Sequence, residues 1–264
     1  MLGNLPVAAV IILLLLPPAY GQLTEQDVVA NDWPRANRIF HSDFRWKGSD
    51  AVYSIDLGQD RVLWLFGDAL IAHKAPYLRR EDCVAFIRNC VAIQIGYDPT
   101  VATMEFFWSQ RGEKPGSFFS EEDTIWYWPL DGVMIDGRLL LFLSKVGSVE
   151  SGLGFEARGL DARVVVNPQD RPDKWTMRNA QLPEVPWCES FGSAVEISLD
   201  TLYAFCCNLD HAISLARWSL DSAQNGSLGN AEDFLHEHTR GIIQTRPTGR
   251  ARHRAVARRS PLWI

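Results

Sequence analysis

The segment Asp131-Gly132-Val133-Met134-Ile135-Asp136-Gly137-Arg138-Leu139-Leu140-Leu141-Phe142-Leu143 contains two apolar runs separated by Asp136-Gly137. An Asp-Gly pair between two such runs is a strong signal for a two-residue β-hairpin turn. We therefore predict a hairpin here. Its first strand begins near Trp126-Tyr127-Trp128-Pro129, and its second strand contains Leu139 to Leu143.

The opening of this hairpin has counterparts along the chain. A polar residue, a small residue and valine, followed by an apolar stretch, occur at Asp50-Ala51-Val52, Asn89-Cys90-Val91, Asp131-Gly132-Val133 and Ser193-Ala194-Val195. Self-similarity at intervals of roughly 40 to 60 residues is typical of repeated β-units such as propeller blades. We expect each phrase to open the inner strand of its own blade, which makes four blades recognisable and a fifth incomplete or absent.

Composition agrees with an all-β domain. The apolar runs are short, rich in β-branched and aromatic residues, and interrupted by Gly, Pro, Asp and Asn, which favours strands. Gly152-Leu153-Gly154-Phe155-Glu156-Ala157 matches a dinucleotide fingerprint, but it leads into a strand pattern instead of a helix, so we expect no nucleotide site there. We place the propeller domain at residues 22–239.

The amino-terminal residues differ in kind from this domain. Val7 to Leu16 is an unbroken apolar run, followed by Pro17-Pro18-Ala19-Tyr20-Gly21. Ten apolar residues cross only about half of a ~30 Å hydrocarbon core, so we expect no stable membrane span. The length suits the core of a signal peptide. We expect residues 1–21 to direct export, making the protein secreted, extracellular or periplasmic; the alternative is an uncleaved interfacial anchor.

The five cysteines give two possible bridges in an exported protein, Cys83 with Cys90 and Cys188 with either Cys206 or Cys207. Their spacing contains no CxxC pair. The nearest histidine pair, His236-Glu237-His238, is better explained as solvated loop histidines than as zinc ligands. We therefore predict neither a metal site nor a cofactor.

Charge divides the chain into an acidic body and a basic tail. The formal net charge is −6, yet residues 240–264 contain seven arginines and no carboxylate. This irregular tail has two interpretations. The favoured one is a truncated or misframed end, and the other is an arm that binds nucleic acid. We therefore predict no nucleic-acid partner. Separately, we expect the protein to be a monomer.

Two of the four repeated phrases begin with aspartate, which raises a catalytic hypothesis. In a propeller, Asp50 and Asp131 would face one axial pocket, with Asn89 and Ser193 beside them. Two carboxylates across a pocket are the working groups of glycoside hydrolysis, where one protonates the leaving oxygen and the other activates water or attacks carbon. The alternative is that each aspartate only caps a turn.

Other side chains could complete such a pocket. Glu189 precedes the fourth phrase and is a candidate third acid, as is Glu156, which could equally face solvent. Asp68 follows Gly67 at a strand end near the same rim. Trp128 could stack on a sugar, but strand alternation sends Trp126 and Trp128 to one side, where core packing is the commoner fate.

Several of these motifs together resemble a known family. The motifs are Trp46-Lys47-Gly48-Ser49-Asp50-Ala51-Val52-Tyr53-Ser54-Ile55, Leu63-Trp64-Leu65-Phe66-Gly67-Asp68, Arg88-Asn89-Cys90-Val91-Ala92, Trp128-Pro129-Leu130-Asp131-Gly132-Val133 and Gly154-Phe155-Glu156. Over about residues 33–235 the chain is similar to secreted proteins with a domain of unknown function, identified as five-bladed β-propellers. These proteins resemble endo-D-arabinan hydrolases and, more distantly, arabinanases and fructan hydrolases.

The resemblance implies that Asp50 and Asp131 belong to the pocket, with Asp68 and Asn89 close by. The chain departs from the family pattern at Ala69, where threonine is common, and at Leu130, where glycine is common. We therefore expect an O-glycosyl hydrolase acting on an arabinan-like polysaccharide or oligosaccharide. The catalytic residues would be Asp50, Asp131 and Glu189, and the substrate-binding residues Asp68, Asn89, Trp128 and Ser193. The alternative is a non-catalytic propeller that binds a glycan or a protein.

Overall fold

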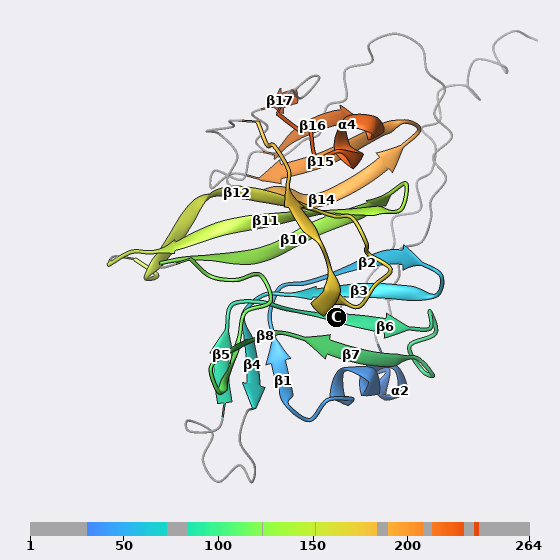
Figure 1. Ribbon diagram of the computed structural model, residues 1–264, viewed down its shortest axis with the longest axis vertical. Helices are drawn as coiled ribbons and strands as arrows, with labels where there is room; N and C mark the ends of the chain where they lie inside the picture. Colours follow the sequence, from blue (N-terminus) through green and yellow to red (C-terminus); the bar gives the residue numbers. More distant parts are fainter. Residues whose placement is uncertain are drawn as a thin grey trace, which may run out of the picture.

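Antiparallel β-sheet dominates the computed structural model, which describes residues 31–72, 84–122, 124–150, 152–183, 190–207, 213–229 and 235–237. Within this part, three sheets have four strands each, one has three, and one is a two-stranded ribbon. The helical turns are short: α2 (Pro34–Asn37), η2 (Arg38–His41), η3 (Pro172–Lys174) and α4 (Leu220–Gln224). The predicted all-β class is confirmed at this level (Figure 1).

The first sheet has the order β2-β3-β6-β7. Its strands are β2 (Val52–Gly58), β3 (Arg61–Phe66), β6 (Cys90–Ile95) and β7 (Thr103–Phe107). Asn89-Cys90-Val91 therefore opens the third strand of this sheet, and the expectation that it opens a separate blade is wrong. The prediction failed because β4 and β5 lie between β3 and β6 in the sequence, although β3 and β6 are paired. The distance in sequence between the first two phrases therefore resembles that between two blades.

The strands between β3 and β6 form most of a small sheet of order β1-β4-β5. It comprises β1 (Trp46–Ser49), β4 (Ala69–Ala72) and β5 (Val84–Ile87), and the ribbon β8 (Ser109–Arg111) and β9 (Lys114–Gly116) lies beside β5. The small sheet shares a core with the first sheet, in which Trp46 stacks on Phe106 with ring centroids 4.9 Å apart. One side of the first sheet is thereby covered.

The second sheet contains the predicted hairpin. Its order is β10-β11-β12-β13, and the strands are β10 (Ile125–Ile135), β11 (Arg138–Ser148), β12 (Phe155–Val165) and β13 (Met177–Asn179). Asp136 and Gly137 both have positive φ, 45° and 81°, as the two-residue turn requires. The hairpin prediction is confirmed.

The third sheet has the order β14-β15-β16-β17. Its strands are β14 (Ser190–Ser198), β15 (Thr201–Cys207), β16 (Ile213–Ser219) and β17 (Leu235–Glu237). Helix α4 follows β16 and is capped by Ser219, whose side chain accepts a hydrogen bond from the Ser222 backbone N–H. This helical turn packs Ala223 into the core between the second and third sheets.

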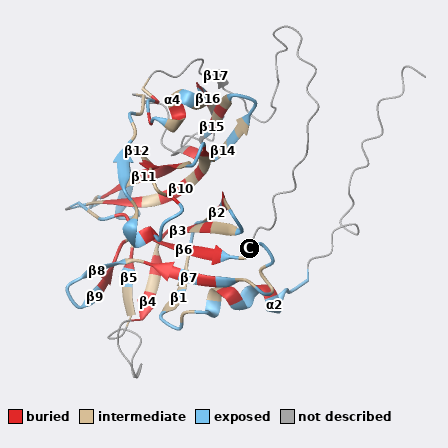
Figure 2. Ribbon diagram, turned by 45° about the vertical axis from the view of Figure 1, so that its right-hand side comes forward, coloured by how far each residue is buried: buried red, intermediate tan, exposed pale blue. Residues whose placement is uncertain are grey.

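The three four-stranded sheets are layered in chain order (Figure 1). One apolar core joins the first sheet to the second and includes Leu65, Val91 and Leu141. Another joins the second sheet to the third and includes Phe142 and Trp218. Strand β10 contacts both β2 and β14, so the first strands of the three sheets are neighbours. Figure 2 shows that buried residues concentrate inside these layers.

Each of these first strands has an irregularity at the repeated phrase. The register of β10 shifts between Pro129 and Gly132, and that of β14 shifts between Phe191 and Ala194. Ahead of β2, the Gly67 N–H bonds to the carbonyls of both Asp50 and Ala51. Such bulges re-aim side chains near a strand end. The repeated phrase therefore marks a register shift in β10 and β14. Ahead of β2 it marks the shared Gly67 bond, while the register shift of β2 lies between Asp56 and Gly58.

Several predictions concern residues outside the described ranges: the signal peptide at 1–21, the tail at 240–264, and the side chains of Cys83, Cys188 and Glu189. Cys90 is described, and it is a free, buried thiol whose pKa burial raises to about 12. The bridge considered between Cys83 and Cys90 is therefore not formed. None of the described helices is long and apolar enough to cross a membrane.

Candidate functional site

Asp50 and Asp68 meet where the first sheet adjoins the small sheet. The Asp50 N–H donates to the Asp68 carbonyl at 3.1 Å, and the Gly67 N–H donates to the Asp50 carbonyl at 3.0 Å. The Asp50 carboxylate packs closely over Gly67, because a Cβ added there would lie 2.6 Å from Asp50 Oδ1. Backbone bonds and close packing thus place the exposed Asp50 beside Asp68.

The side chain of Asp68 connects the first sheet to the second. Its Oδ1 accepts a hydrogen bond from Trp128 Nε1 at 2.9 Å, and Arg88 Nη1 lies 3.5 Å from its Oδ2. Burial raises the pKa of Asp68, and the charge of Asp50 adds to the rise, while the bonds from Trp128 and Arg88 partly offset it. Asp68 therefore lies at the end of its strand, as expected, and contacts Trp128 of the second sheet.

Arg88 lies among aromatic rings. Its guanidinium carbon is 4.1 Å from the ring centroid of Trp126 and 4.9 Å from that of Phe86. Trp126 and Trp128 point to the same side of β10, as alternation predicts, and their centroids are 6.2 Å apart. Trp126 is buried and Trp128 is half-buried, so core packing accounts for the first ring more fully than for the second.

Asp131 occupies the bulge of β10. Its Oδ1 accepts from the Gly132 N–H at 2.8 Å, and its Oδ2 accepts from the Val195 N–H at 3.0 Å. Burial raises the pKa of Asp131, the charge of Glu196 adds to the rise, and the two backbone bonds partly offset it. The pKa of Tyr53 on β2 is raised by burial and by the charge of Asp131. Asp131 thus lies at the junction of all three first strands.

Asn89 is fully buried, with 0% of its surface exposed. Its Nδ2 donates to the carbonyls of Phe119 and Tyr127 at 3.2 and 2.8 Å, and its Oδ1 accepts from the Phe119 N–H at 2.7 Å. All of these bonds are internal to the fold. Asn89 therefore fastens the start of β6 to β10 and to the segment that precedes it, and it does not reach an open surface as a substrate ligand would.

The remaining predicted residues are placed as follows. Ser193 lies in the bulge of β14, where its Oγ donates to the Phe205 carbonyl at 3.3 Å. Glu156 is exposed on β12 and pairs with Arg158 at 2.8 Å, so it faces solvent and not the Asp131 bulge. Glu189 lies outside the described residues. Across the described part of the chain, no group of three or more His, Cys, Asp or Glu side chains could hold a metal ion.

Residues 35–219 match the sequence profile of a family described as a domain of unknown function, DUF5005. The chain belongs to the DUF5005 family. The expected relationship to a domain of unknown function is thereby confirmed, and the finer relationship to endo-D-arabinan hydrolases stays a prediction. None of the curated proteins compared with this chain matches it.

Two solved structures have some similarity to this DUF5005 chain. A Bacteroides ovatus ATCC 8483 protein, provisionally named a hydrolase, superposes with a TM-score of 0.54 at 13% identity, covering 70% of this chain and 51% of its own. The catalytic domain of a Coprinopsis cinerea GH62 α-L-arabinofuranosidase gives a TM-score of 0.38 at 9% identity, covering 73% of this chain and 51% of its own. The chain spans about half the length of each. The first similarity shows the fold alone.

Sequence reasoning missed two residues of the DUF5005 site. Arg88 and Tyr53 both lie inside motifs that carried the family resemblance, each close to a residue that was singled out. A basic residue directly before Asn89 was a usable signal for a carboxylate partner, whereas the electrostatic coupling of Tyr53 to Asp131 depends on how β2 packs against β10.

Proposed function

We propose that this DUF5005 domain belongs to an exported five-bladed β-propeller that hydrolyses O-glycosidic bonds in an arabinan-like polysaccharide. The three four-stranded sheets are its first three blades, and their first strands line the axis. The observation that carries the proposal is that Asp50 and Asp131 each open the repeated phrase of neighbouring first strands. Asp131 lies in the register shift of β10, and Asp50 lies two residues ahead of β2, in contrasting surroundings.

The different surroundings of Asp50 and Asp131 suit two different catalytic roles. A glycosidase needs one carboxyl that holds a proton and one that is ionised, and different environments provide this. Burial raises the pKa of Asp131, which favours it as the acid that protonates the leaving oxygen. Asp50 is exposed and can reach water, which favours it as the base or the nucleophile. Glu189 is retained as a third acid, and Asp68, Trp128 and Ser193 as substrate contacts.

A second candidate function has its own supporting observation. Both oxygens of Asp131 accept backbone hydrogen bonds, which is also what a purely structural carboxylate does. If Asp131 only fastens two sheets together, the same rim belongs to a non-catalytic module that binds a glycan.

Substitution of each aspartate by asparagine distinguishes the two functions. General acid–base help is worth about 10²–10⁴ in rate, so Asp50→Asn and Asp131→Asn should each lower turnover of an arabinan by at least about 10²-fold while binding survives. The exposed Asp200, on the turn between β14 and β15, provides a control, and Asp200→Asn should leave turnover unchanged. A protein that binds glycans but cleaves none across arabinans, fructans and xylans is the binding module.

A further inference from the structure

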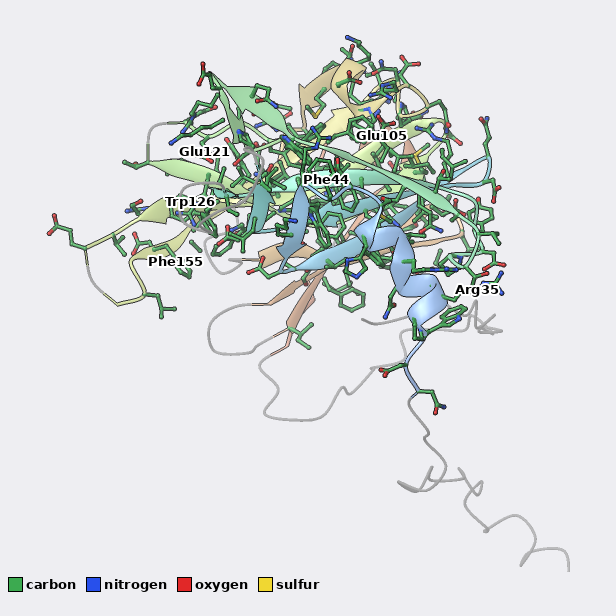
Figure 3. The ribbon with its side chains drawn as sticks, turned by 90° about the horizontal axis from the view of Figure 1, so that it is seen from below. Arg35, Phe44, Glu105, Glu121, Trp126 and Phe155 are labelled. Carbon is green, nitrogen blue, oxygen red and sulfur yellow. The ribbon has the colours of Figure 1, made fainter. Side chains whose placement is uncertain are left out.

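A row of aromatic side chains and one arginine passes beside Asp68 and joins three strands that are distant in sequence. Phe86 on β5, Arg88 beyond it, Trp126 and Trp128 on β10, and Phe155 on β12 make up this row, which we call the aromatic strip. Consecutive members are in contact. Phe155 lies edge-on to Trp128, with ring centroids 5.1 Å apart. Its centroid lies 6.5 Å from that of Trp126, and Figure 3 shows these two residues near each other.

The two ends of the aromatic strip are open to solvent. Phe86 is 55% exposed and Phe155 is 37% exposed, whereas Trp126 between them is 5% exposed and forms the floor. A single exposed apolar residue is normal on a protein surface. Here two exposed phenylalanines flank Arg88, Trp126 and Trp128, and a contiguous apolar surface edged by polar groups is the arrangement expected of a binding surface.

Polar groups are interleaved with the rings and are held in place. The side chain of Arg88 is 31% exposed while it stacks on Trp126 and pairs with Asp68. The bond from Trp128 Nε1 to Asp68 Oδ1 fixes the orientation of that indole. A surface whose rings and charges are already positioned loses little conformational freedom when it binds a ligand.

We propose that the aromatic strip binds a run of sugar units that extends beyond the bond to be cleaved. The faces of sugar rings combine apolar C–H groups with hydroxyls, and they fit a surface that alternates aromatic rings with a charged pair. A lipid surface would require a wider apolar patch without Arg88 and Asp68 in it. The choice of a glycan as the ligand rests on the proposed function, but binding by the strip does not require catalysis.

Phe155 gives the cleanest test, because it is exposed and lies at the outer end. Phe155→Ala should weaken retention on soluble arabinan, fructan or xylan in native affinity gels by about 3- to 10-fold, which corresponds to the loss of one aromatic contact of about 0.5–1.5 kcal/mol. Phe155→Tyr keeps the ring and should restore retention. Leu153 lies in the same hairpin and is 83% exposed, so Leu153→Ala should bind as the wild type does.

The outcomes separate this inference from the proposed hydrolysis. Loss of retention in Phe155→Ala with unchanged turnover of a short aryl glycoside supports the strip. Retention that depends on Phe155 in a protein without any hydrolytic activity also supports it, and then only the hydrolase proposal fails. Unchanged retention in Phe155→Ala, an equal loss in Leu153→Ala, or no retention of the wild type on any of the three polymers overturns the inference.

Discussion

Oδ2 of Asp131 accepts a 3.0 Å hydrogen bond from the backbone N–H of Val195, which joins the first strand of the second sheet to the first strand of the third. The residue proposed as the catalytic acid therefore also links two sheets through a hydrogen bond. Changes at Asp131 should affect both stability and chemistry, and the two effects can be separated by their pH dependence.

The pH dependence of stability should differ between Asp131→Asn and the wild type. Because the folded-state pKa of Asp131 is raised, its carboxyl binds a proton more tightly in the folded state than in the unfolded state. Stability from this group is then present below the unfolded pKa of about 3.9 and is lost as the pH rises through the folded pKa. Relative to the wild type, Asp131→Asn should gain stability as the pH rises from about 4.

Urea unfolding of both proteins at a series of pH values measures this difference, with Asp200→Asn run in parallel. Other carboxylates titrate in the same range, but they are common to both proteins and cancel. A difference that does not change with pH would show that the Asp131 carboxyl is not perturbed.

The buried amide of Asn89 should be essential for stability. Asn89→Ala leaves the N–H of Phe119 and the carbonyls of Phe119 and Tyr127 without their partner. Each such buried group costs about 1–3 kcal/mol, so we expect a loss of at least about 3 kcal/mol in the free energy of unfolding. Asn225, the residue directly after α4, is exposed, and Asn225→Ala should cost less than about 1 kcal/mol. Equal losses in the two variants would refute the fastening role of Asn89.

Trp128→Phe should raise the pKa of Asp68 further. The substitution keeps an aromatic ring but removes the N–H that stabilises the ionised carboxylate. Titration of the carboxyl carbon by NMR would follow the shift. Trp175→Phe is the matched control, because that indole donates to the Asp170 carbonyl and lies away from Asp68. An unchanged Asp68 titration in Trp128→Phe would mean that the 2.9 Å bond does not form in solution.

The bulge of β14 should not tolerate a side chain at Gly192. Its φ is +79°, and an added Cβ would overlap the ring of Phe142. We expect Gly192→Ala to lose about 2–5 kcal/mol, from left-handed strain and overpacking together. Gly58 has a similar φ of +73° with nothing within 4 Å, so Gly58→Ala isolates the strain and should cost about 1–2 kcal/mol. Thermal melts of both variants give the comparison.

The sequence predicted local structure well where the signal was local. The Asp136-Gly137 turn and the strand pairs on either side of it were predicted from turn chemistry and alternation, and the structure confirms them. The third strand of the first sheet was misplaced, because pairing between β3 and β6 bridges an inserted segment, and no local pattern records which strand a returning segment joins.

The candidate site was partly predictable for the same reason. Asp68 and Trp128 were each singled out, and they meet. Their contact depends on how two sheets pack, as does the bond of Asp131 to Val195. Asn89 was expected at an open rim because of its phrase, but its position directly before β6 buries it instead.

The insertion between β3 and β6 affects the order in which the protein can fold. Strands β10, β11 and β12 are joined by turns, so their contacts close short loops and should form early. The first sheet is complete only after β6 has paired with β3, and closing the longer loop between these strands costs additional entropy before that pairing is gained. During synthesis, the second sheet can therefore provide the surface on which the amino-terminal one is finished, and the earliest part of the chain becomes one of the last to consolidate.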